Sequence, residues 1–211
     1  MTRRPFILVL AGVNGAGKSS VGGALLTERD LVWYNPDAQA REAQANAGLS
    51  LEDANAYAWN LGADKLRAAM AGGTNFAFET TLGADTIPRL LIEASKTHDV
   101  MMWFCGLASP ELHIERVALR VSQGGHPIPE EKIRARWTSS VANLIRLLPH
   151  LAVLHVYDNS ATAELGEDIP DPVLVLEMRR GDVIVPDATD PAALAAVPAW
   201  ARAIVEAALE L

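Results

Sequence analysis

An octet near the amino terminus, Gly12-Val13-Asn14-Gly15-Ala16-Gly17-Lys18-Ser19, restricts the fold of this chain more than any other feature. It matches the P-loop pattern of a glycine, four arbitrary residues and then Gly-Lys-Ser/Thr. The motif requires a strand before it and a helix after it. Residues 6–11 are continuously apolar, as in a strand buried on both faces, and residues 18–28 are expected to form the helix.

The rest of the chain continues this alternation of strands and helices. Apolar runs predict further strands at residues 31–34, 75–78, 100–107 and 151–157, and helices are expected after Asn35, after Ser50, and at 88–96, 110–122 and 130–148. Such an order is typical of an α/β fold. We therefore predict a P-loop NTPase fold, with a mostly parallel sheet flanked by helices.

The last quarter of the chain has a different character. Residues 173–176 and 183–185 are joined through Arg179-Arg180-Gly181-Asp182 and predict a β-hairpin, and one Ala-rich helix is expected from Asp190 to the end. We expect residues 1–160 to form the core, with a lid around 110–140. Residues 161–211 are expected to be an appendage packed on the same domain.

Composition narrows the classes of partner. The net charge is −8, which does not suggest the basic surface of a nucleic-acid-binding domain. No stretch reaches the roughly 20 apolar residues of a membrane span. Arg3 and Arg4 before residues 6–11 imitate a signal peptide, but cleavage there would destroy the P-loop. We expect a cytoplasmic protein without membrane or nucleic-acid partner, and a buried thiol at Cys105.

The P-loop predicts a nucleoside triphosphate site with Mg²⁺. Its glycines allow backbone N–H groups to point at phosphate oxygens, and the following helix adds its dipole. Lys18 is expected on the β- and γ-phosphates, and the Ser19 hydroxyl on Mg²⁺. A dinucleotide-binding pattern does not fit the glycine spacing. The residues expected to bind the nucleotide in this segment are Asn14, Gly15, Ala16, Gly17, Lys18, Ser19 and Ser20.

Two carboxylates follow predicted strands at the edge where α/β sheets build their sites. Asp37 comes after residues 31–34 and could accept a proton from a substrate hydroxyl, although an aspartate also suits the start of a helix. Glu79, with Thr80 beside it, follows residues 75–78 and could bind an acceptor or hold Mg²⁺ through water. The alternative for Glu79 is a solvated carboxylate at the end of a strand.

Arginines on both sides of a glycine-rich loop suggest a lid over phosphates. Arg116 and Arg120 are four residues apart on one predicted helix, and Arg134 and Arg136 lie beyond the loop that contains His126. Arginines there would stabilise charge on a transferred group. Alternatively, they pair with nearby glutamates on a solvated face. His126 either contacts the acceptor or is merely structural.

Together these segments resemble one family. The motifs are the P-loop, Asn35-Pro36-Asp37, Phe78-Glu79-Thr80-Thr81-Leu82, Arg116-Val117, Arg120-Val121, Gly124-Gly125-His126-Pro127-Ile128-Pro129, Ile133-Arg134-Ala135-Arg136 and Tyr157-Asp158-Asn159-Ser160. In this order, over residues 5–160, the sequence resembles the zeta-toxin family of P-loop kinases, in the branch often labelled predicted ABC-type ATPase. The hairpin and last helix are outside the resemblance.

The resemblance implies transfer of the γ-phosphate of ATP or GTP to an alcohol. Zeta toxins phosphorylate UDP-N-acetylglucosamine and are held inactive by an antitoxin protein. By resemblance, Lys18 binds phosphate, Asp37 is the base, Glu79 belongs to the acceptor site, and Asn159 lies near the nucleotide base. One arginine of each pair would clamp phosphate, with Arg120 and Arg136 as the catalytic choices and Arg116 and Arg134 as acceptor contacts.

The sequence also departs from the family. The lid loop differs from that of the well-known toxins, and no aspartate ends the strand at residues 100–107. The alternatives are therefore another small-molecule P-loop kinase or a non-catalytic, nucleotide-dependent binding or switch protein. A polynucleotide kinase would need a basic strand-binding channel.

Overall fold

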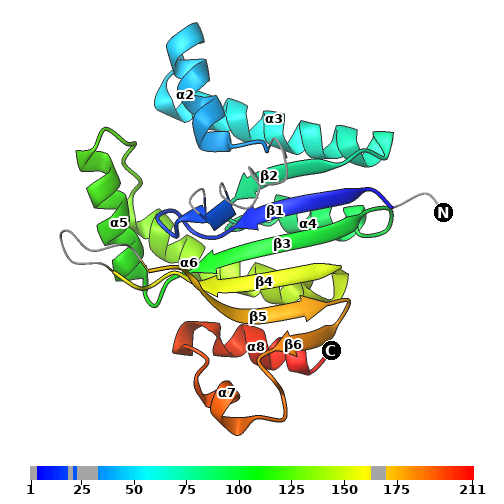
Figure 1. The fold of residues 1–211 in the computed structure, drawn as a ribbon. Helices are drawn as coiled ribbons and strands as arrows, with labels where there is room; N and C mark the ends of the chain where they lie inside the picture. Colours follow the sequence, from blue (N-terminus) through cyan, green and yellow to red (C-terminus); the bar gives the residue numbers. More distant parts are fainter. Residues whose placement is uncertain (1–3, 19–20, 23–32, 163–169) are drawn as a thin grey trace.

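A six-stranded sheet in the order β2-β1-β3-β4-β5-β6 forms the centre of the molecule (Figure 1). The structure is a computed structural model that describes residues 4–18, 21–22, 33–162 and 170–211. The strands are β1 (Phe6–Ala11), β2 (Phe76–Thr80), β3 (Asp99–Gly106), β4 (Val153–Asp158), β5 (Val173–Arg179) and β6 (Asp182–Val185). The first four are parallel, whereas β5 and β6 are antiparallel to their neighbours. The predicted α/β class with a mostly parallel sheet is confirmed.

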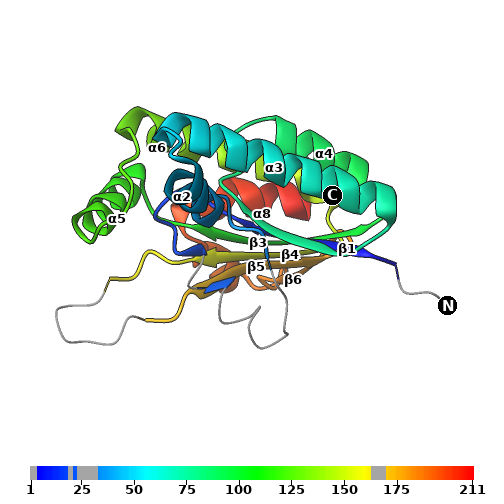
Figure 2. The same ribbon diagram turned by 90° about the horizontal axis from the view of Figure 1, so that it is seen from above.

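The α-helices bounded in the structure lie around this sheet. They are α2 (Pro36–Ala47), α3 (Leu51–Gly72), α4 (Thr86–Ala94), α5 (Pro110–Ser122), α6 (Glu130–Leu147), α7 (Pro191–Ala195) and α8 (Arg202–Leu209). Figure 2 shows α3, α4, α6 and α8 on one face of the sheet, with α2 and α5 beyond its end. The apolar sides of α3, α4, α6 and α8 pack on the inner face of the strands and form the main core with it. The predicted helix at 18–28 lies largely outside the described residues.

Helix starts follow the capping signals of the sequence. The side chain of Asn35 accepts a hydrogen bond from the Ala38 amide, and Pro36 occupies the first turn of α2. Ser50 caps α3 in the same way through the Asp53 amide. These caps fix where α2 leaves the sheet, and therefore where its first-turn carboxylate lies.

Three predicted elements differ from the structure. Within the described part of residues 31–34, Tyr34 forms only a single bridge to Phe78, instead of a full strand. The strand predicted at 75–78 continues through Glu79 and Thr80, since both pair with β1. The single last helix is broken into α7, a 3₁₀ turn and α8, because Pro198 precedes the turn and lacks the N–H that a continuous helix needs.

The C-terminal segment completes the main core. Trp200, Ala201 and Ile204 are all buried and belong to the same apolar cluster as the strands. The indole of Trp200 stacks with Phe104 and lies so close to Gly106 that a Cβ there would overlap it. Its Nε1 donates to Asp158 Oδ1 at 3.2 Å. The end of the chain therefore supports the carboxyl ends of β3 and β4.

No helix among the described residues is long and apolar enough to span a membrane.

Candidate active site

The P-loop leaves β1 in a conformation that requires glycine. Gly12, Gly15 and Gly17 have φ angles of 139°, 84° and 83°, which side-chain-bearing residues rarely adopt. A Cβ on Gly12 would also overlap the carbonyl oxygen of Cys105 on β3. The turn is therefore curled tightly against the sheet. A tight turn of this kind lets successive backbone amides point at a bound anion.

Lys18 is at the end of this turn, half-buried and lining the cleft beside the P-loop. Burial lowers the pKa of its ammonium, and the nearby carboxylates of Glu79 and Asp37 act in the opposite direction. A partly desolvated cation of this kind is stabilised by an anion in contact with it, such as a phosphate. The glycine conformations and this lysine fit the phosphates of a nucleotide. Ser19 and Ser20, the expected Mg²⁺ and phosphate contacts, lie outside the described residues.

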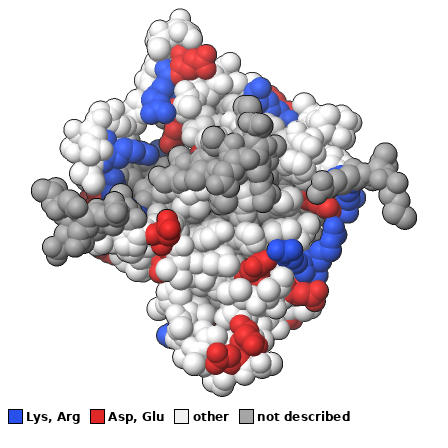
Figure 3. Space-filling model, viewed as in Figure 1, with Lys and Arg blue, Asp and Glu red and all other residues white. Residues whose placement is uncertain are grey.

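A cleft of about 1040 Å³ opens beside the P-loop. It lies between the loop, α2, the first half of α3, the end of β2, and the lid, by which we mean α5, α6 and the loop 123–129 between them. Figure 3 shows the hollow between α2 and the lid, with Lys and Arg side chains on both rims. Its lining includes five cationic and three anionic side chains: Lys18, Arg41, Arg120, Lys132 and Arg136 against Asp37, Glu52 and Glu79.

Asp37 faces this cleft from the first turn of α2. Its Oδ2 lies 3.8 Å from Nη1 of Arg120, so α2 and the lid meet through an ion pair across the opening. Arg120 also donates through Nη2 to the carbonyl of His126 at 3.3 Å. The expected base, one expected phosphate-binding arginine and the loop histidine are thus neighbours, and all three line the cleft.

Glu79 is held from the β2 side of the cleft. It is 7% exposed, and its Oε1 accepts hydrogen bonds from Trp33 Nε1 at 3.0 Å and Asn35 Nδ2 at 3.1 Å. Both donors are neutral side chains, and Glu79 itself lines the cleft. Sequence reasoning missed both donors: Asn35 carried only a helix-capping signal, and nothing in the sequence linked Trp33 to Glu79. Thr80 also lines the cleft, and its carbonyl accepts the Gly12 amide at 3.2 Å.

Arg136 reaches the cleft from α6. Its Nη1 donates to Oδ1 of Asn14 in the P-loop at 2.7 Å. Burial lowers the pKa of its guanidinium, and the charge of Asp37 opposes that shift. Arginine remains protonated in proteins, so a positive charge stands next to the phosphate cradle.

The other arginine of each pair lies outside the cleft. Arg116 donates to the carbonyl of Ala161 at 2.9 Å, next to the segment predicted to approach the nucleotide base. Arg134 pairs with Glu111 at 2.6 Å and with Glu130 at 3.9 Å. Residues two apart on a helix point in nearly opposite directions, so Arg134 and Arg136 cannot both line one site.

Asn159 supports the P-loop from behind. Its Nδ2 donates to the carbonyl of Ala16 at 2.9 Å, and its backbone amide donates to Gly106 at 3.0 Å. A Cβ on Gly17 would overlap the Asn159 side chain. In this structure Asn159 contacts the loop that would hold the nucleotide, and its predicted approach to the base remains a prediction.

The far wall of the cleft is one face of α3. Glu52, Asn55, Trp59 and Gly62 are spaced three or four residues apart, and all of them line the opening. At 1.5 Å per residue this face is about 15 Å long. Trp59 is 41% exposed, which is unusual for so large an apolar ring. We call the part of the cleft that this face of α3 lines its long arm.

Comparison with known proteins gives one family and several structures. The family model for Zeta toxin matches residues 1–165. No curated protein matches the sequence significantly. A chain of the AvrRxo1-ORF1:-ORF2 complex crystallised with ATP is 19% identical, with a TM-score of 0.63 over 89% of this chain and 62% of that chain. A chain of the PezAT chromosomal toxin–antitoxin system of Streptococcus pneumoniae is 18% identical, with a TM-score of 0.57 over 74% and 68%. At these identities the structures establish the fold alone.

Proposed function

Because the chain belongs to the zeta toxin family, we propose that it is a kinase that transfers the γ-phosphate of ATP or GTP to a hydroxyl of a small molecule. The observation that carries this proposal is the convergence of Lys18, Asp37, Arg120 and Arg136 on one cleft beside the P-loop. Each of these side chains has the chemistry that one part of phosphoryl transfer needs.

The transfer divides among these groups. Lys18 and the P-loop amides bind the β- and γ-phosphates. The carboxylate of Asp37 accepts the proton of the acceptor hydroxyl, whose oxygen attacks the γ-phosphorus as the bond to the bridging oxygen breaks and ADP leaves. Arg120 and Arg136 stabilise the charge on the transferred group. Mg²⁺, for which Ser19 is the expected ligand, would neutralise phosphate charge when bound.

The acceptor we propose is UDP-N-acetylglucosamine or a similar sugar nucleotide. The long arm of the cleft along α3 exceeds the length of a single sugar ring, and Trp59 presents a flat apolar surface there. Arg41, four residues after Asp37 on α2, supplies a further positive charge to the cleft. Glu79 would bind acceptor hydroxyls. We also propose that the protein acts in the cytoplasm as a toxin and has an antitoxin partner, as in the PezAT toxin–antitoxin system.

An acceptor screen tests the proposal. The protein is incubated with labelled ATP and a panel of UDP-sugars, simple sugars and polyols, and transfer of label is measured. We expect label on UDP-N-acetylglucosamine, reduced by at least about a hundredfold in Asp37→Asn. Asp64→Asn is the matched control, because Asp64 pairs with Arg67 on the exposed side of α3 and is not among the residues that line the cleft.

The other outcomes separate the alternatives. Label on a polyol or another metabolite would identify a different small-molecule kinase. Tight ATP binding without transfer to any acceptor would favour a nucleotide-dependent binding or switch protein. Growth arrest on expression, relieved by a co-expressed neighbouring gene product, would support the toxin.

A further inference from the structure

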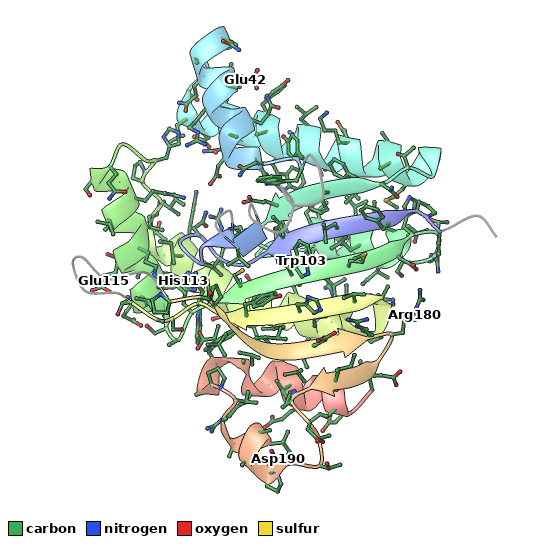
Figure 4. All side chains as sticks on the ribbon, viewed as in Figure 1. Glu42, Trp103, His113, Glu115, Arg180 and Asp190 are labelled. Atoms are coloured by element: carbon green, nitrogen blue, oxygen red, sulfur yellow. The ribbon has the colours of Figure 1, made fainter. Side chains whose placement is uncertain are left out.

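Asn14, the third residue of the P-loop octet, is held by both lid helices. Its backbone carbonyl accepts a hydrogen bond from Nδ1 of His113 on α5 at 2.9 Å. Its side-chain Oδ1 accepts one from Nη1 of Arg136 on α6 at 2.7 Å. Both Asn14 and His113 are buried, at 6% and 1% exposed. Figure 4 labels His113 on the side of α5 toward the strands, whereas Glu115 points away from them.

Apolar packing joins the same three parts. Val13 of the P-loop, Val117 of α5 and Ile133 of α6 are buried in a small cluster separate from the main core. Gly15 lies against the backbone of α5, where an added Cβ would be 2.9 Å from the His113 carbonyl oxygen. The lid therefore rests on the P-loop itself, through contacts on both sides of Asn14.

The two side chains that bind Asn14, His113 and Arg136, differ in charge. Burial lowers the pKa of His113 to about 4, so the imidazole is neutral near pH 7. A carbonyl can only accept, so Nδ1 carries the proton. Arg136 is different, because it is charged and the carboxylate of Asp37 attracts it. Asp37 already pairs with Arg120 at 3.8 Å. Without the Asn14 oxygen, Arg136 would be drawn to Asp37 as a second cation, and the carboxylate would become a weaker base.

We propose that Asn14 is a positioning residue that holds Arg136 toward the transferred phosphate and away from Asp37. His113 fixes the backbone from which Asn14 reaches Arg136. This inference rests on the proposed function, since it presupposes a nucleotide on the P-loop. In effect, one P-loop residue sets the orientation of an arginine that belongs to the lid.

A double-mutant cycle tests the proposal on the full chain. Asn14→Ala, Arg136→Ala and the double variant are compared in two measurements: the dissociation constant of ATP, and the single-turnover rate of γ-phosphate loss to the acceptor or to water. We expect each single variant to lose about tenfold to a hundredfold in rate. We expect the double variant to match Arg136→Ala, because Asn14 acts only through that arginine. ATP affinity should change by less than about threefold in Asn14→Ala, since the phosphate-binding amides remain.

Two further variants control the cycle. Arg146→Ala removes an arginine of α6 that pairs with Asp85 at 2.7 Å, outside the cleft, and should leave both measurements unchanged. If Asn14→Ala does not fold, as judged by circular dichroism, Asn14→Ser replaces it, because its hydroxyl is too short to reach Arg136. The cycle is then run in the same way.

The possible results lead to different conclusions. Rate losses that multiply in the double variant, or an ATP affinity that falls as much as the rate, would overturn the positioning role and make Asn14 a structural part of the loop. If the wild-type protein transfers phosphate normally, such a result refutes this inference alone. If the wild-type protein binds no ATP, the proposed function and this inference both fail.

Discussion

The buried histidine of α5 should make the folded protein sensitive to acid. The pKa of His113 falls from its ordinary 6.5 to about 4 because the ring is buried, so in this range the unfolded chain binds a proton that the folded chain does not. Stability from this group is fully present above about pH 6.5 and is lost as pH falls toward 4. A fall in pKa of about 2.5, at about 1.4 kcal/mol each, gives a total loss of about 3.5 kcal/mol, of which about 3 kcal/mol is lost by pH 4.

His113→Asn isolates this contribution. Its side-chain N–H occupies a position similar to Nδ1 and can still donate to the Asn14 carbonyl, but it does not titrate. The free energy of unfolding is measured by urea denaturation for both proteins between about pH 7 and about pH 4. The smaller side chain introduces a constant offset, and the carboxylates titrate in both proteins. The wild type should therefore lose about 3 kcal/mol more than the variant over this range.

Parallel curves for the two proteins would refute the reasoning, because His113 would then ionise in the folded state as readily as in the unfolded one. If the variant does not fold, titration of the His113 ring by NMR in the wild type decides the question. A measured pKa near 6.5 would contradict a buried neutral ring that donates to the P-loop.

Three other outcomes follow from the structure. Trp59→Ala should raise the KM for the acceptor by about tenfold or more and change the KM for ATP little. Tyr57 is an exposed aromatic residue outside the cleft, so Tyr57→Ala should change neither KM. Equal effects of the two variants would contradict acceptor binding in the long arm of the cleft. Trp200→Ala should lower the free energy of unfolding by about 3–5 kcal/mol, because a buried indole leaves a cavity in the main core, and a loss under about 1 kcal/mol would contradict that packing. Burial raises the pKa of the Cys105 thiol to about 12, so iodoacetamide near pH 8 should modify it only after unfolding, and rapid labelling of the native protein would contradict this.

Local signals in the sequence were sufficient for the family and the fold class, and they indicated the edge of the sheet beside which the candidate site lies. The P-loop octet specified its own strand and turn, and the Asn35-Pro36 start of α2 located Asp37 because a capped helix begins at a defined residue. Continuous apolar runs identified β1 and β3, because strands that are buried on both faces of a parallel sheet have no polar alternation. These features depend on neighbours a few residues apart.

The remaining features depend on residues that only the fold brings together. Spacing could not tell which arginine of each pair lines the cleft, since Arg134 is drawn to Glu111, 23 positions earlier on α5. The contact between His113 and Asn14 spans 99 positions, and no local pattern marks it. The net charge of the chain also gave no information about the cleft. A net charge of −8 is compatible with a cleft in which cations outnumber carboxylates, because net charge does not indicate where charges lie.

The position of Trp200, in the 3₁₀ turn before α8, also affects the order in which the P-loop and its support form during synthesis. Trp200 must pack against Gly106 and bond Asp158 before the ends of β3 and β4 are supported, and these ends border the P-loop. Since the chain is made from the amino terminus, the ribosome finishes the P-loop early and this supporting residue late. A nascent chain that has not yet reached Trp200 would therefore carry the P-loop before the ends of β3 and β4 are supported.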